Sequence, residues 1–208
     1  FMDMGNVYKD QGEYAQAIEH YYRAVGILEG LSHLKEMTRA YINLGAAYVH
    51  MGEYKRASDY FMKCVELADK IGHKKRKAWG LFNLAESLAM MGKLTRAREL
   101  VDQSMEIAEE MDDQAAIAYN HRVLGIIHAR RRSFDLAENE FEESMAIQER
   151  YKMVYHLAET LVEYGKMLAL KGDKGKAVRK LRKAQELFGR LNNLAYRERV
   201  QKVIDSLE

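Results

Sequence analysis

One segment recurs five times in this 208-residue chain, without a gap, at a spacing of 40 residues. The five copies begin at Phe1, Tyr41, Leu81, His121 and Leu161, and the second reads YINLGAAYVHMGEYKRA. Repeats of this length are single supersecondary units that bury their apolar faces against neighbouring copies. The period therefore limits the chain to a stacked repeat architecture.

Four columns of the repeat indicate what each copy is. One column is small, which lets two helices approach closely, and its members are Gly5, Gly45, Ala85, Gly125 and Gly165. A second marks the end of a helix in a left-handed turn, and its members are Gly12, Gly52, Gly92, Arg132 and Gly172. A third is always alanine, from Ala17 to Ala177, and a fourth, four residues later, is apolar: Tyr21, Phe61, Val101, Phe141 and Leu181. Together they predict a helix–turn–helix unit.

The sequence therefore predicts an all-α solenoid of five helical hairpins. It contains no proline, a residue that breaks helix interiors. In the second copy we expect helices at about Leu34–Met51 and Tyr54–Ile71. The predicted repeats are 1–33, 34–73, 74–113, 114–153 and 154–191, followed by a C-terminal capping helix at 194–207, all within one domain, 1–208. The first helix looks shortened, so we expect a fragment of a longer protein.

These columns resemble the tetratricopeptide repeat, whose pattern is W-x2-L-G-x2-Y, then A-x3-F, then a small residue. The second copy matches it with Tyr41, Leu44, Gly45, Tyr48, Ala57, Phe61 and Cys64. The 40-residue period and the missing terminal proline resemble the long-repeat branch, as in LGN/Pins-type adaptors, kinesin light chain-like arrays and bacterial peptide sensors. The resemblance implies a right-handed superhelix that holds a peptide or partner helix in a concave groove.

In that family the first helix of each repeat lines the groove. Carried over position by position, the resemblance implies these groove residues: Asn6, Arg39, Asn43, His50, Trp79, Phe82, Asn83, Glu86, Tyr119, Arg122, Arg130 and Lys166. Aromatic side chains would anchor a partner, amides would bind its backbone, and arginines would pair with its carboxylates. For Trp79 and Phe82, packing between helices explains the residue type equally well.

The sequence carries no motif for catalysis. Phosphate-loop, zinc-protease and nucleophile-elbow patterns do not occur. Cys64, the one cysteine, stands in a small-residue column and is expected to be a buried, unreactive thiol. His121 and His128 are seven residues apart, which suits a hydrogen-bonded core position better than a metal site. We expect no enzyme activity, no cofactor and no metal.

The predicted function is a protein–protein interaction module with a scaffold or regulatory role. A regulatory domain that senses a signal peptide is the alternative. A less favoured one is nucleic-acid binding through basic runs at 73–77, 130–132 and 179–183, because such runs also suit solvated faces and loops and because the acidic remainder of the chain would repel a polyanion. A homo-oligomer stays open. No apolar run approaches the roughly 20 residues of a membrane span, so we expect no membrane partner. A single cysteine suits a cytoplasmic location.

Overall fold

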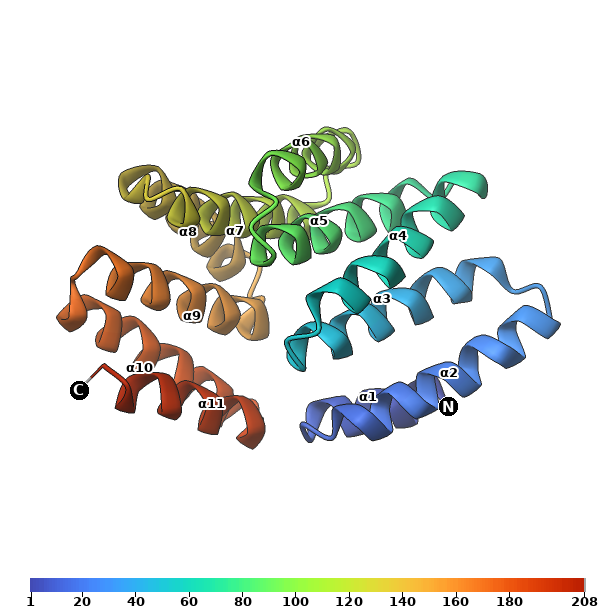
Figure 1. Ribbon diagram of the computed structural model, residues 1–208, viewed down its shortest axis with the longest axis horizontal. Coiled ribbons are helices and arrows are strands. Elements are labelled where there is room, and N and C mark those ends of the chain that lie inside the picture. Colours follow the sequence, from blue (N-terminus) through green and yellow to red (C-terminus); the bar gives the residue numbers. More distant parts are fainter. Residues whose placement is uncertain (208) are drawn as a thin grey trace. The chain divides into compact units, whose positions relative to one another are not determined.

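The computed structural model describes residues 1–207, and every element within that range is an α-helix (Figure 1). The helices are α1 (Met2–Asp10), α2 (Tyr14–Gly30), α3 (Leu34–His50), α4 (Tyr54–Lys70), α5 (Lys74–Met90), α6 (Leu94–Glu110), α7 (Gln114–Arg130), α8 (Phe134–Arg150), α9 (Val154–Lys171), α10 (Lys174–Arg190) and α11 (Leu194–Asp205). The all-α prediction is confirmed. The predicted helices of the second repeat were each one residue too long.

A turn with the same backbone hydrogen bonds joins every pair of successive helices, and it spans three residues except between α9 and α10, where it spans two. At the α3–α4 turn, the Gly52 N–H donates to the Val49 carbonyl at 2.9 Å and the Glu53 N–H donates to the Tyr48 carbonyl at 2.9 Å. Gly52 has φ +77°, the left-handed conformation that closes a helix in this motif. These turns recur every 20 residues, which gives the two helices of a hairpin almost equal lengths in the second to fifth hairpins.

Half of these turns place a residue other than glycine in the left-handed conformation. Those residues are Ser32, Asp112, Arg132, Lys152 and Asn192, with φ between 50° and 60°. The backbone hydrogen bonds are the same as at the glycine turns: the Met153 N–H donates to the Gln148 carbonyl at 2.8 Å. The hydrogen bonds of the turn therefore hold a backbone conformation that such residues rarely adopt.

The chain divides into two compact units. The first unit, residues 1–116, holds α1 to α6, in which each helix packs on the next, and in which α3 also contacts α1 and α5. The second unit, residues 117–208, holds the rest of α7 and helices α8 to α11. There α9 packs between α8 and α10, and α11 covers α10 with buried Val200 and Ile204. That the five repeats act as one domain stays a prediction.

The small-residue column lies where the two helices of a hairpin meet. A Cβ atom added to Gly45 would lie 2.4 Å from the Phe61 ring, far inside van der Waals contact. The same holds for Gly5 against Tyr21 at 2.4 Å and for Gly125 against Phe141 at 2.8 Å. The large side chain of the second helix therefore fills the space that the glycine leaves open. In the third repeat both columns change together, to Ala85 and Val101.

A further small-residue column holds serine in the third and fourth repeats, and these hydroxyls bind backbone carbonyls; its members are Ala24, Cys64, Ser104, Ser144 and Ala184. The Ser104 and Ser144 hydroxyls donate to the carbonyls of Ala78 and Ala118 at 3.0 and 2.7 Å. Cys64 occupies the same column with 0% exposure, and burial raises the pKa of its thiol to about 12. The thiol is buried, as predicted.

We predict that Gly45→Ala lowers the free energy of unfolding by about 2 kcal/mol, because the new methyl group must displace the Phe61 ring in a packed core. Phe61→Val should relieve this clash, since the third repeat pairs Ala85 with Val101. Urea unfolding of both single variants and the double variant measures the coupling, expected to favour the double variant by about 1 kcal/mol.

Gly26→Ala is the matched control, because Gly26 is helical and has no atom within 4 Å of an added Cβ. It should raise the free energy of unfolding by about 1 kcal/mol through helix propensity alone. Equal effects of the two alanine substitutions would contradict the close-contact explanation.

Candidate binding surface

Within each unit, the first helices of successive hairpins contact each other through residue pairs with the same sequence separation. In the first unit, the Asn43 Nδ2 donates to the Asn6 Oδ1 at 3.1 Å. In the second unit, Arg122 pairs with Glu159, and Tyr119 pairs with His156. In each pair the two residues are 37 positions apart, so α1 and α3, and likewise α7 and α9, contact each other at an offset three residues shorter than the repeat. We call the face that the first helices form in each unit its helix-A wall: α1, α3 and α5 in the first unit, and α7 and α9 in the second.

Asn6, Asn43 and Asn83 of the first unit each form hydrogen bonds within the protein with some of their side-chain amide atoms. Asn6 accepts hydrogen bonds from the Tyr21 hydroxyl at 2.8 Å and from Asn43. Asn83 donates from Nδ2 to the Trp79 carbonyl, one turn earlier, at 2.7 Å. All three are half-buried. The Oδ1 atoms of Asn43 and Asn83 accept no protein hydrogen bond from residues 1–207, so both amides keep an acceptor for a ligand.

Trp79 is held by an ion pair at the start of the next repeat. Its indole Nε1 donates to the Asp113 Oδ2 at 3.1 Å, and the Lys75 Nζ lies 3.1 Å from the same oxygen. Partial burial by itself would raise the pKa of the Asp113 carboxyl, but the hydrogen bonds from Trp79, Lys75 and the Ala116 N–H outweigh it and lower that pKa below its usual value. Asp113 therefore stays ionised and fixes the indole.

Phe82 does not lie on an accessible surface. Its side chain is 1% exposed, and its ring centroid lies 5.7 Å from that of Trp79. The packing explanation therefore holds for Phe82 in this structure, whereas Trp79 is half-buried. Sequence spacing placed both on one helix face but did not indicate how deeply each is buried.

The other predicted residues of the first unit are at least partly accessible. Arg39 is exposed, and Glu86 is half-buried. His50 is half-buried, with its ring centroid 5.2 Å from that of Tyr14 on α2.

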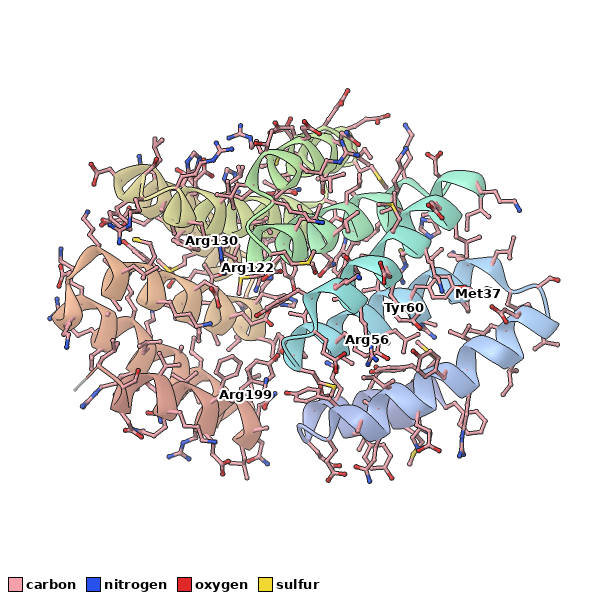
Figure 2. All side chains as sticks on the ribbon, in the orientation of Figure 1. Met37, Arg56, Tyr60, Arg122, Arg130 and Arg199 are labelled. Carbon is pink, nitrogen blue, oxygen red and sulfur yellow. The ribbon has the colours of Figure 1, made fainter. Side chains whose placement is uncertain are left out.

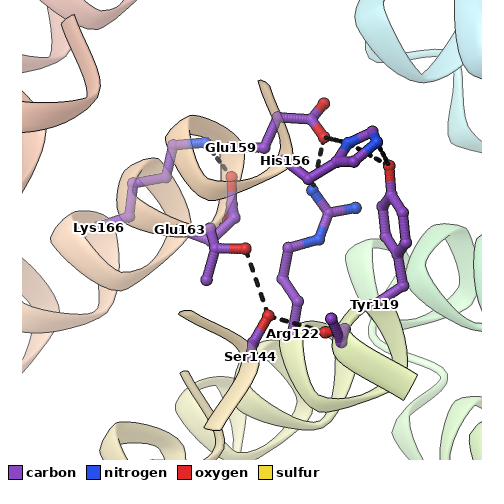
Figure 3. A network of polar contacts seen from close by, with 9 residues as sticks. Tyr119, Arg122, Ser144, His156, Glu159, Glu163 and Lys166 are labelled. Atoms are coloured by element: carbon purple, nitrogen blue, oxygen red, sulfur yellow. Dashed lines mark hydrogen bonds and ion pairs between the residues drawn. The ribbon is translucent and has the colours of Figure 1, made fainter. Parts of the chain in front are cut away.

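The second unit places a charged network on its helix-A wall (Figure 3). The Arg122 guanidinium lies 3.2 Å from the Glu159 Oε2 and 4.9 Å from the centre of the Tyr119 ring. The Tyr119 hydroxyl contacts both His156 ring nitrogens, with Nε2 at 3.1 Å, and the His156 Nδ1 lies 3.5 Å from the same Glu159 oxygen. α7 supplies a cation and an aromatic ring, and α9 supplies a carboxylate and an imidazole.

Packing alone would predict an apolar residue at position 122, where the chain has an arginine. It is 5% exposed, yet the equivalent positions of the neighbouring repeats hold Ile42, Phe82 and Val162. Removing an arginine and a glutamate from water costs several kcal/mol, and a well-packed apolar pair is often as stable as the ion pair. The fold therefore does not explain the charge, which makes this network the strongest candidate for recognition.

His156 was not among the predicted groove residues. His156 could have been identified from its separation of 37 residues from Tyr119. That separation depends on how α7 and α9 are shifted relative to each other, and the 40-residue period does not contain it.

Arg130 and Lys166 are both exposed, and Lys166 pairs with Glu163 on its own helix at 2.7 Å. Figure 2 shows Arg122 and Arg130 on the same helix, α7.

The two histidines predicted for the core, His121 and His128, are half-buried. The His121 Nδ1 lies 2.7 Å from the Glu140 Oε2 on α8, which supplies the hydrogen bond expected for it. No group of three or more His, Cys, Asp or Glu within residues 1–207 is arranged to hold a metal ion. None of the described helices is both long and apolar enough to cross a membrane.

A tyrosine cluster in the first unit surrounds a cavity of about 330 Å³. The Tyr22 hydroxyl lies 2.9 Å from the Tyr48 hydroxyl and 2.6 Å from the Tyr60 hydroxyl. The Arg56 guanidinium lies 5.6 Å above the Tyr48 ring, and Figure 2 shows Arg56 and Tyr60 on the same helix. Because these groups bind one another, the cluster stabilises the packing of α2, α3 and α4.

The profile of the MalT-like TPR region matches residues 5–204 of the chain. A comparison with curated proteins found no match.

Several solved structures share the fold. The Rap conjugation gene regulator of the plasmid pLS20, in complex with the Phr* peptide, has a TM-score of 0.83 at 17% identity, over 100% of this chain and 57% of that one. A Rap protein complexed with Competence and Sporulation Factor has a TM-score of 0.79 at 17% identity, over 94% and 55%. A putative kinesin light chain from Podosopora anserina has a TM-score of 0.58 at 16% identity, over 92% and 94%. The chain spans little more than half of either Rap protein.

We predict that Glu159→Ala lowers the free energy of unfolding by about 3 kcal/mol, because Arg122 is left charged and nearly buried. The double variant Arg122→Ile, Glu159→Ala should return to within about 1 kcal/mol of the unmodified protein, since isoleucine is the residue of the second repeat at this position. Urea unfolding followed by circular dichroism tests both. A double variant less stable than Glu159→Ala would show that the fold itself requires the ion pair.

Proposed function

Since this chain belongs to the tetratricopeptide repeat family, as a MalT-like repeat region over residues 5–204, we propose that it is a protein-interaction module. It binds a peptide or a partner helix against the helix-A wall of its repeats. The role is that of a scaffold or regulator in the cytoplasm, without a catalytic step.

The observation that carries the proposal is the Arg122–Glu159 pair. Arg122 is charged at a position where the neighbouring repeats hold apolar residues, and its pair with Glu159 lies beside Tyr119 and His156. A ligand carboxylate would compete with Glu159 for the guanidinium, which binds carboxylates through paired hydrogen bonds. The tyrosine ring adds contact area at low entropic cost.

The wall of the first unit supports an extended peptide as the ligand class. Asn43 and Asn83 occupy the same position of successive repeats, and each keeps its Oδ1 as an acceptor. Amide oxygens one repeat apart would accept hydrogen bonds from the backbone N–H groups of a peptide without reading its sequence. Trp79, fixed by Asp113, would supply the apolar anchor beside them.

The comparisons favour a peptide over a folded domain as ligand. Two of the similar structures are Rap proteins whose complexes hold the Phr* peptide and Competence and Sporulation Factor. A regulatory domain that senses such a signal is the narrower form of the same proposal. It would add a change of conformation upon binding to the recognition step.

Selection from a random peptide library on the immobilised protein tests the proposal. We expect enriched peptides to bind with dissociation constants that rise at least about tenfold in the double variant Arg122→Ile, Glu159→Ala, because a charged contact to the ligand is lost. Fluorescence polarisation of the labelled peptides measures the constants. Arg98→Ala is the matched control, because Arg98 pairs with Asp102 on the second helix of a hairpin, away from the wall.

Two results would contradict the proposal. One is a library selection that enriches no peptide above an unrelated immobilised protein. The other is peptide binding that Arg98→Ala weakens as much as the double variant does. Thermal unfolding of each variant shows that the loss of binding is not a loss of the fold.

A further inference from the structure

A second cavity lies in the first unit, at the N-terminal ends of the wall helices α3 and α5. Its volume is about 790 Å³, and it lies where the turns before α3 and α5 approach the end of α6. Three apolar side chains line it: Leu34, Ile71 and Met111. Met111 is 42% exposed, so the cavity offers accessible apolar surface.

Basic side chains surround this apolar lining. Lys35, His73, Lys74 and Lys75 all line the cavity. Lys74 pairs with Glu110 at 2.5 Å, and Lys75 pairs with Asp113 at 3.1 Å. Lys35 is exposed and makes no ion pair with any residue of the range 1–207. Two lysines are therefore already oriented by acidic partners, and a third is available to an incoming charge.

The charged neighbours of His73 are two cations, Lys35 and Arg76, and one carboxylate, Glu36. Partial burial lowers the pKa of its imidazole, and the charges of Lys35 and Arg76 lower it further. The Arg76 backbone N–H donates to the His73 Nδ1 at 3.4 Å, so a neutral ring carries its proton on Nε2. The ring then offers a donor and no additional charge beside the lysines.

The turn itself does not require these basic residues. The same backbone hydrogen bond forms at each repeat start, from His73 N–H to the Ala68 carbonyl at 2.8 Å and from Asp113 N–H to the Ala108 carbonyl at 2.9 Å. The residues that follow differ: HKKRK at 73–77, DQAAI at 113–117 and MVYHL at 153–157. Because the fold makes the same turn without lysines, the cations of this repeat need another explanation.

We propose that this cavity binds an acidic peptide segment that carries apolar side chains, on a partner protein. The apolar lining would take up one or two side chains of the segment, and the lysines would pair with the carboxylates on either side. A nucleic acid fits less well, because the apolar lining of Leu34, Ile71 and Met111 makes no favourable contact with a phosphate backbone. This site lies in the first unit, whereas the Arg122–Glu159 pair that carries the proposed function lies in the second, so its failure would leave the proposed function standing.

A labelled eight-residue peptide in which Asp and Glu alternate with Leu and Phe is the probe. Two comparison peptides separate its features: one replaces the acids by Asn and Gln, and the other replaces Leu and Phe by Gly. Fluorescence polarisation at moderate salt should show the acidic, apolar peptide binding the unmodified protein at least about tenfold more tightly than either comparison peptide.

Lys35→Glu tests the site without removing an internal ion pair, and it should weaken binding about tenfold because an attraction becomes a repulsion. Met111→Gln should weaken binding through the apolar lining. Lys55→Glu is the matched control: it makes the same charge change on an exposed lysine of α4 that lies outside the cavity, and it should leave binding unchanged. The double variant Arg122→Ile, Glu159→Ala should also bind the probe normally.

Three outcomes would overturn the proposal. The probe peptide does not bind, or Lys55→Glu weakens binding as much as Lys35→Glu does, or single-stranded RNA displaces the peptide and loses affinity through Lys35→Glu. The last result would assign the cavity to phosphates instead of carboxylates. Circular dichroism of each variant confirms that the helices are retained.

Discussion

The contact between a small residue on the first helix of a hairpin and a large one on the second determines this structure. At Gly45 and Phe61 the two helices approach so closely that no Cβ atom fits between them. Because the contact recurs at 40-residue spacing, the hairpins repeat a single geometry. The 20-residue spacing of the turns extends that regularity, since both helices of a hairpin end in the same left-handed turn. The fold therefore depends on few positions in each repeat and leaves the others free to vary.

That freedom separates the positions that hold the fold from the positions that carry function. The contact columns keep glycine, alanine and a large apolar residue, whereas the helix-A wall changes from Ile42 to Phe82, Arg122 and Val162 at a single position. The repeat starts change in the same way, from a basic sequence at 73–77 to a neutral one at 153–157. A nearly buried charge such as that of Arg122 is often no more stabilising than a well-packed apolar residue, which is why we propose that recognition of a partner explains it.

The helices and turns could be predicted from the sequence because local residue patterns that recur every 40 residues specify them. Gly52 predicted its turn, but Ser32 and Lys152 adopt the same conformation without any glycine to signal it. The wall was harder to predict because burial there depends on how adjacent first helices are shifted. Trp79 and Phe82 are three residues apart, yet Phe82 is buried. His156 is recognised as part of the wall only from its contact with Tyr119, because the two residues lie on different helices.

Hydrogen–deuterium exchange of the protein with and without a selected peptide tests the central claim, that the varied face of the first helices is the recognition surface. A ligand bound to the side chains of a helix stabilises that helix, so its backbone hydrogen bonds open less often and its amides exchange more slowly. We expect slower exchange in the peptic fragments that contain α7 and α9, and unchanged exchange in those of α4 and α6. Protection confined to α4 and α6, with none in α7 and α9, would contradict it.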